Sequence, residues 1–223
     1  MTSRRFPEAS AVSVGGFVRD DTPTHEIDRR EAVLESLAGT VRELIDATIR
    51  TTVDDDEVHR VREDVAALVA RLRADQLPGP AGVRYNGEVR VWNWGNAVVG
   101  AANAVAPPLR VVQTPAGCHA DLVLGAAYEG PPGLVHGGVS AMLLDHIMGV
   151  TASAMRRTTF TGTLTTRYRR GTPLGPLRLE ASIVREEGRK VFVAGSISDA
   201  DGVTVEADGV FIQPAGMGDA PRE

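Results

Sequence analysis

Asp145 is a single acidic residue inside an apolar stretch, residues 133–149, which reads GLVHGGVSAMLLDHIMG. A carboxylate among apolar side chains loses hydration, and burial raises its pKa unless partners stabilise the charge. Carboxylates with a shifted pKa gather at functional sites, where they act as general bases or nucleophiles. We therefore take Asp145 as the candidate catalytic residue. The alternative is a hydrogen-bonded core aspartate or one that faces solvent through a gap.

His136, Gly137 and Gly138 stand where the helix that carries Asp145 is expected to begin. Two glycines let a ligand approach the backbone, and the first N–H groups of a helix have no partner within it. Such groups can form an oxyanion hole for a carbonyl oxygen that becomes negative. A flexible helix entry is the alternative interpretation of the glycine pair.

The spacing of these groups predicts more than one copy of the chain. His136 and Asp145 are nine residues apart in sequence, roughly 13 Å along a helix axis. A reacting carbonyl needs its oxyanion donors about 3 Å away and its base almost as near. We expect a homodimer, or a dimer of dimers, in which antiparallel helices set the helix start of one copy beside the Asp145 of the other.

The segment after the helix, residues 160–170, reads FTGTLTTRYRR and is expected to be a strand. Strict alternation puts Thr161, Thr163, Arg167 and Arg169 on one face. A hydroxyl beside the carboxylate can orient a water molecule, and guanidinium groups can hold phosphates. A solvated strand face is an equally good interpretation of the arginines.

The elements that must position these residues follow from periodicity. Apolar residues at helical spacing predict helices over residues 25–50 and 54–74, and a turn-rich break follows at 76–82. Alternation then predicts strands before and after the central helix, which is expected over 136–156. The expected strands are 108–114, 119–128, 160–170, 177–187, 189–199 and 203–213, with 89–94 either a strand or an aromatic plug.

A helix that is apolar all round must be wrapped by other elements. The expected fold is therefore α+β, an antiparallel sheet curled around one long central helix. We expect an N-terminal helical extension over residues 1–82, with 1–24 poorly ordered, then the sheet domain over 83–216 and a flexible tail over 217–223.

Composition argues against several classes of protein. A net charge of −5 disfavours nucleic-acid binding, which needs a basic surface. The histidines lack the spacing of metal ligands, and the single cysteine, Cys118, is expected to be a small buried residue. No apolar run reaches the roughly 18 residues that span a membrane, and Pro7 and Glu8 interrupt any secretory signal. We expect a soluble cytoplasmic protein without a metal.

Three stretches together resemble a known family: AYEGPPGLVHGGVSAMLLDHIMG, TGTLTTRYRRGTPLG and EGRKVFVAGSISDADG. They resemble the PaaI-like branch of the hotdog-fold acyl-CoA thioesterases, closest to the subgroup containing thioesterase superfamily member four. The resemblance covers about residues 105–213. It implies a hotdog fold, dimers or dimers of dimers, and hydrolysis of acyl-CoA thioesters without a cofactor, coenzyme A being part of the substrate.

The resemblance also implies roles for individual residues. Asp145 matches the family's helical acid, and His136, Gly137 and Gly138 match its HGG motif, whose backbone N–H groups polarise the thioester carbonyl. Thr161 matches the threonine that positions water, with Thr163 in its place if the strand slips by two residues.

Substrate contacts rest on the residues themselves. We expect Arg167, Arg169 and Arg170 to bind coenzyme A because of their charge. Met142, on the aliphatic helix, is expected to contact an apolar acyl group. The N-terminal helices exceed the family's minimal unit, and they either cap the acyl pocket or make an oligomer contact.

Two other functions stay open at the level of sequence. One is a hotdog hydratase or dehydratase, which needs a histidine working with the acid. The other is a non-catalytic acyl-CoA sensor or scaffold, against which the buried charge of Asp145 argues. Acyl chain length, the choice between coenzyme A and an acyl-carrier protein, and the pathway do not follow from the sequence.

Overall fold

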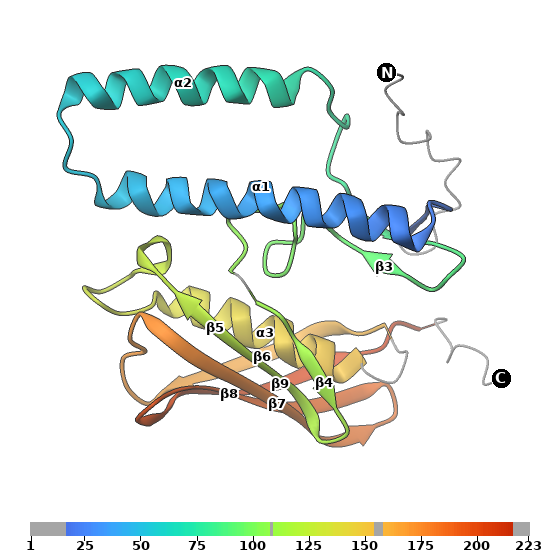
Figure 1. Ribbon diagram of the computed structural model, residues 1–223. Coiled ribbons are helices and arrows are strands. Elements are labelled where there is room, and N and C mark those ends of the chain that lie inside the picture. Colours follow the sequence, from blue (N-terminus) through green and yellow to red (C-terminus); the bar gives the residue numbers. More distant parts are fainter. Residues whose placement is uncertain (1–16, 108, 154–157, 216–223) are drawn as a thin grey trace. The chain divides into compact units, whose positions relative to one another are not determined.

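The structure is a computed structural model that describes residues 17–107, 109–153 and 158–215 (Figure 1). The chain divides into two compact units, with the boundary between Ala106 and Pro107. The predicted tail over 217–223 lies outside the described residues.

The first unit contains two antiparallel helices and a small sheet (Figure 1). Its elements are β1 (Phe17–Arg19), α1 (Thr24–Arg50), α2 (Asp55–Arg73), β2 (Val83–Tyr85) and β3 (Val91–Trp92). Both helices agree with the predicted ranges to within one residue at each end. The start of α2 is capped by Asp54, whose side chain accepts a hydrogen bond from the N–H of Glu57 at 2.9 Å.

The strand β1 corrects the prediction that residues 1–24 are poorly ordered, which is wrong for 17–24. β1 pairs in parallel with β2, and the next residue, Asp20, is only 5% exposed. Arg84 forms an ion pair with the Asp20 carboxylate at 2.9 Å. Burial by itself would raise the pKa of Asp20, but hydrogen bonds from Thr22 and Arg84 outweigh it and lower that pKa.

Residues 83–106 belong to the first unit, together with the helices, whereas we predicted from the sequence that the sheet domain begins at residue 83. The difference arises from contacts between residues about 60 positions apart in the sequence. Glu31 of α1 accepts hydrogen bonds from Arg90 at 2.8 Å and from the Trp94 indole at 2.7 Å. These side-chain contacts tie the segment to α1, so it completes the first unit.

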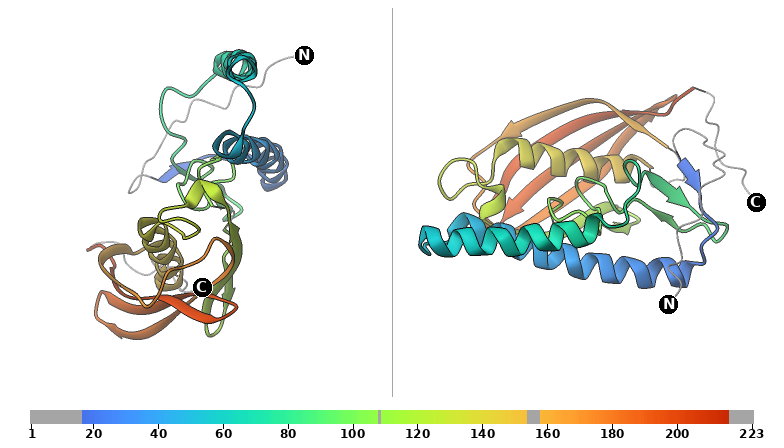
Figure 2. Two further views of the ribbon diagram at one scale, coloured as in Figure 1. Left: turned by 90° about the vertical axis from the view of Figure 1, so that its left-hand side faces the viewer. Right: turned by 90° about the horizontal axis from the view of Figure 1, so that it is seen from above.

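The second unit is a six-stranded antiparallel sheet with one long helix against it. Its elements are β4 (Val112–Thr114), β5 (Gly117–Leu124), a 3₁₀ turn (Ala126–Tyr128), α3 (Gly137–Ser153), β6 (Phe160–Tyr168), β7 (Gly175–Glu187), β8 (Lys190–Asp199) and β9 (Gly202–Ile212). The strand order is β4-β5-β7-β8-β9-β6, which leaves β6 at one edge. The sheet curves around α3 (Figure 2), so the predicted hotdog architecture is confirmed.

The core forms where α3 meets the inner face of the sheet. Leu143, Leu144, Ile147 and Met148 of α3 are fully buried. Gly195 on β8 lets this helix come close, because a Cβ there would lie 2.8 Å from the Met148 sulfur. Cys118 is 4% exposed, as predicted for a small buried residue.

Candidate active site

Asp145 lies in the middle of α3 and has a hydroxyl partner on the next strand. The Thr161 Oγ1 donates a hydrogen bond to Asp145 Oδ1 at 2.8 Å. Asp145 is half-buried and Thr161 is exposed, so solvent reaches the pair. A carboxylate with a neighbouring hydroxyl at a solvated position can hold a water molecule and accept its proton.

An irregularity in β6 aims Thr161 at the helix. Thr161 lies opposite Phe211 of β9, but Thr163 lies opposite Val210, so Gly162 has no partner in the ladder. Phe211 is 1% exposed and faces α3, and residues directly opposite share a face. The bulge therefore turns Thr161 towards α3 and Thr163 away from it. The prediction that both threonines share a face is wrong, because it assumed unbroken alternation.

The HGG segment forms the start of α3, as the sequence predicts. The N–H of His136 donates to the Tyr128 carbonyl at 2.9 Å, which holds the approach to the helix. The N–H of Gly138 donates to His136 Nδ1 at 3.0 Å, so this donor is already engaged. Within the described residues, the N–H of Gly137 has no acceptor, and it is the available donor at the positive end of the helix.

Tyr168, at the end of β6, is a site residue that the sequence reasoning did not single out. Its hydroxyl donates to the Gly137 carbonyl at 2.8 Å. A Cβ at Gly137 would lie 3.4 Å from the tyrosine ring, so the ring packs on the helix start. Strand alternation places Tyr168 on the face opposite Arg167 and Arg169, and this position was the only sequence signal for its role.

The two halves of the site are far apart within one copy. Gly137 and Asp145 are eight residues apart on α3, about 12 Å along the helix axis. One copy therefore brings together Asp145 with Thr161, and separately Gly137 with Tyr168.

The three candidate coenzyme-binding arginines each have a carboxylate partner. Arg167 pairs with Asp208, Arg169 with Glu206, and Arg170 with Asp199. The hydrogen bonds from Arg170 lower the pKa of Asp199 to about 2. A phosphate that bound here would have to share these guanidinium groups with the acids.

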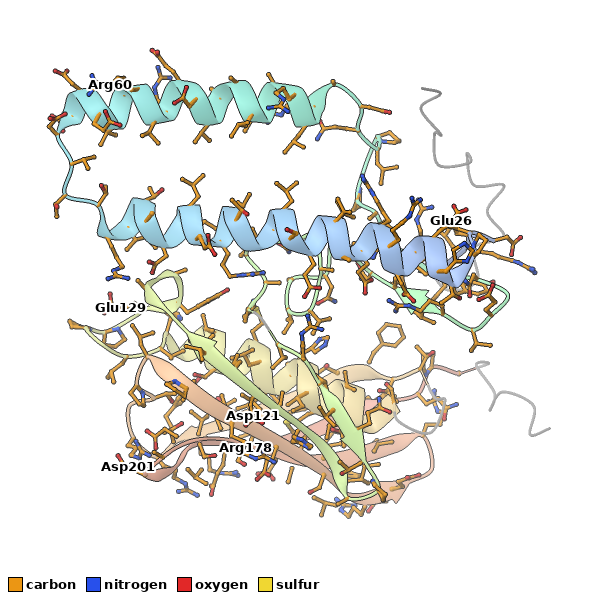
Figure 3. The ribbon with its side chains drawn as sticks, in the orientation of Figure 1. Glu26, Arg60, Asp121, Glu129, Arg178 and Asp201 are labelled. Carbon is orange, nitrogen blue, oxygen red and sulfur yellow. The ribbon has the colours of Figure 1, made fainter. Side chains whose placement is uncertain are left out.

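The outer face of the sheet, away from α3, carries further charge. Arg178 on β7 pairs with Asp121 on β5 at 3.1 Å (Figure 3). A shallow cavity of about 550 Å³ opens on this sheet and includes Arg167 in its lining, but neither Asp145 nor Thr161.

Met142 and His146 lie close to Asp145 on α3. Met142, one turn earlier, is half-buried on the same side of the helix. His146 is half-buried too, and burial lowers its pKa although the charge of Asp145 opposes the shift.

The described residues offer no site for a metal. Among them, no group of three or more histidine, cysteine, aspartate or glutamate residues could hold an ion. No helix in that part of the chain is both long and apolar enough to cross a membrane.

The fold and site define a hotdog-type domain with an acid on its central helix and a glycine pair at the helix start. Comparison with known proteins agrees with this class. The sequence model of the thioesterase superfamily matches residues 132–206. A crystal structure of a protein described as a thioesterase superfamily protein is 34% identical, covers 80% of this chain and 94% of its own, and has a TM-score of 0.71. The chain belongs to the thioesterase superfamily.

Curated relatives cover a shorter stretch. The acyl-coenzyme A thioesterase THEM4 of Xenopus laevis is 35% identical over 92 residues, which is 40% of this chain and 41% of the frog protein. The bovine THEM4, from Bos taurus, is 32% identical over 92 residues, 40% of this chain and 38% of that protein. The chain thus spans about two fifths of the length of these relatives.

Proposed function

We propose that the protein is an acyl-CoA thioesterase that hydrolyses an acyl-CoA thioester to the free acid and coenzyme A. The observation that carries the proposal is the hydrogen bond between Thr161 and the half-buried carboxylate of Asp145. Membership of the thioesterase superfamily and the curated acyl-coenzyme A thioesterases support it.

The reaction needs a nucleophile at the thioester carbon and a donor at its oxygen. Asp145 acts either as a general base on a water held by Thr161 or as the nucleophile itself. With water, one proton passes to Asp145, the C–O bond forms and the C–S bond breaks. The proton then goes to the coenzyme A sulfur, so the products are the acid and the thiol. Either route places a negative charge on the carbonyl oxygen, which a helix-start N–H stabilises.

The donor is the N–H of Gly137, which has no acceptor in the described part of the chain. His136 occupies the N–H of Gly138, and we therefore assign Gly138 the lesser part. His136 and Tyr168 hold the segment rather than react. Met142 contacts the acyl chain, and the arginines of β6 attract the phosphates of coenzyme A.

The site is completed by a second copy. One copy keeps Gly137 about 12 Å from Asp145 along the helix, too far for one carbonyl to touch both. β6 carries Thr161 along an open edge of the sheet, and an edge strand can pair with its equivalent in another copy. A two-fold axis beside β6 gives two equal sites, each with Asp145 from one copy and Gly137 from the other.

Thiol release from a panel of acyl-CoAs tests the activity. Wild-type protein is expected to release coenzyme A, and Asp145→Asn is expected to lose about 10²–10⁴-fold in rate while it still binds substrate. Near-normal release by Asp145→Asn would remove Asp145 from the mechanism. Stoichiometric binding without turnover would favour the sensor, and enoyl-CoA hydration without thiol release would favour the hydratase.

Mixing two inactive variants tests the shared site. Gly137→Pro removes the donor N–H, and proline is well tolerated at the first position of a helix. Random pairing of Gly137→Pro with Asp145→Asn copies makes half of the dimers mixed, each with one intact site. We expect about a quarter of wild-type activity to return. If the mixture is as inactive as each variant alone, the Gly137 N–H and the Asp145 carboxylate of one site come from the same copy.

A further inference from the structure

The helix α2 exposes an apolar stripe along one side. The stripe consists of Val58, Val61, Val65, Leu68 and Leu72. Four of these side chains are 40–55% exposed, and α2 buries none of its residues. A 19-residue helix with no packed face gains little stability from its own hydrogen bonds, so this stripe requires a partner.

The spacing of the stripe identifies the kind of partner. Its residues recur at alternating intervals of three and four, which places them at the a and d positions of a heptad repeat. A strict repeat of this kind is typical of the narrow seam between two helices of a coiled coil. The stripe therefore fits another helix with the same repeat.

Charges beside the stripe select the orientation of that helix. α2 begins with Asp55, Asp56 and Glu57 and has Arg71 and Arg73 in its last turn. A parallel second copy would bring like charges together, whereas an antiparallel copy sets the acidic start of each helix near the basic end of the other.

The register follows from two residues that flank the stripe on the same side, Asp64 and Arg71. Asp64 and Arg71 have no ion pair among the described residues, and the neighbouring charges Arg60, Glu57, Arg62 and Glu63 pair with one another. When Val65 of one antiparallel helix faces Leu68 of the other, Asp64 of each copy lies beside Arg71 of its partner copy. The alternative register, with Val65 facing Val61, would bring the two Asp64 carboxylates together instead.

We propose that α2 pairs with α2 of a second copy as a short antiparallel coiled coil, with Val65 against Leu68 at its centre. The two-fold symmetry repeats the Asp64–Arg71 ion pair at both ends. A seam of this length is small, so the proposed contact along β6 would strengthen the pairing by keeping the helices of the two copies at high local concentration. The inference concerns assembly and does not depend on the proposed activity.

Cysteine cross-linking tests the pairing. Cys118 is the single cysteine of the chain and is buried, so the background is low. The double variant Val65→Cys/Leu68→Cys is expected to form a covalent dimer under mild oxidation, seen as a doubled mass in denaturing electrophoresis. The matched pair Ala67→Cys/Ala70→Cys, with the same spacing on the opposite face, is expected to stay monomeric. Circular dichroism checks that each variant folds.

Charge reversal tests the register in the same cysteine background. Arg71→Asp is expected to reduce the yield of covalent dimer severalfold, and adding Asp64→Arg is expected to restore it, because opposite charges meet again. A covalent dimer from the outer-face pair, or disulfides only within one chain, would overturn the proposal in favour of a stripe that closes on α1. A charge-reversed double variant that stays as weak as Arg71→Asp would also overturn it.

Discussion

The Tyr168 hydroxyl donates to the carbonyl of Gly137 at 2.8 Å and so ties the end of the edge strand β6 to the first turn of α3. Thr161, at the other end of β6, hydrogen-bonds to Asp145 in the middle of that helix. One strand thus fixes both the proposed oxyanion donor and the proposed base. Any shift of β6 along α3 would disturb both groups together.

Tyr168→Phe is expected to lower turnover more than stability. The variant loses one half-exposed hydrogen bond, worth about 0.5–1 kcal/mol of unfolding free energy, but it frees the first turn of α3. We expect kcat to fall severalfold with KM little changed, because a positioning residue acts on the transition state. Steady-state kinetics and urea unfolding measure the two effects. If the loss in kcat, converted to an activation free energy, is no larger than the loss in unfolding free energy, then Tyr168 serves the fold alone.

The bulge at Gly162 predicts opposite outcomes for two neighbouring threonines. Thr161→Val removes the hydroxyl beside Asp145 and is expected to lower kcat roughly tenfold or more. Thr163→Val alters the sheet face away from α3 and is expected to leave kcat within about twofold, and Thr161→Ser should retain most activity. Loss of activity in Thr163→Val with none in Thr161→Val would mean that β6 lacks the bulge.

Much of the fold was predictable because apolar spacing is a local signal. The bounds of α1, α2 and the strands β6–β9 lie within two residues of those predicted from apolar spacing, and the all-apolar α3 required a sheet around it. The order of strands in the sheet was not predicted, since periodicity does not encode which strands pair.

The errors arose where distant contacts decide the outcome. The ion pair of Asp20 with Arg84 joins residues 64 positions apart, and neither residue stands out in its local sequence. Thr163 points away from α3 because of the bulge at Gly162. Gly162 inside the strand pattern was the available signal, because an isolated strand glycine often marks such a bulge.

Gly195→Ala tests how closely the sheet packs on α3. The added Cβ would lie 2.8 Å from the Met148 sulfur and 3.3 Å from a Leu144 methyl, so the helix core must shift. We expect a loss of about 1–3 kcal/mol in unfolding free energy. Gly39→Ala, in α1 with nothing within 4 Å of the added Cβ, is the control and should raise stability by up to about 1 kcal/mol. Denaturant unfolding of both variants compares the two effects.

Arg169 offers a direct test of phosphate recognition. If its guanidinium attracts coenzyme A, Arg169→Gln raises KM for an acyl-CoA but not for the matching acyl-pantetheine, which has no phosphates. Glu206→Gln removes the acid that pairs with Arg169, and we expect it to lower KM for acyl-CoA only. Parallel changes for both substrates would exclude Arg169 from phosphate binding.

His146 predicts a loss of stability in mildly acidic solution. Burial lowers its pKa in the folded protein below the ordinary 6.5, while the unfolded chain keeps the ordinary value. Between these two values the unfolded state binds more protons, so the free energy of unfolding falls as pH drops below about 6.5 and levels off below the folded pKa. His146→Gln removes the titration and should flatten this part of the profile. Urea unfolding of both proteins between pH 5 and 8 measures it, and identical slopes would show that His146 titrates alike in both states.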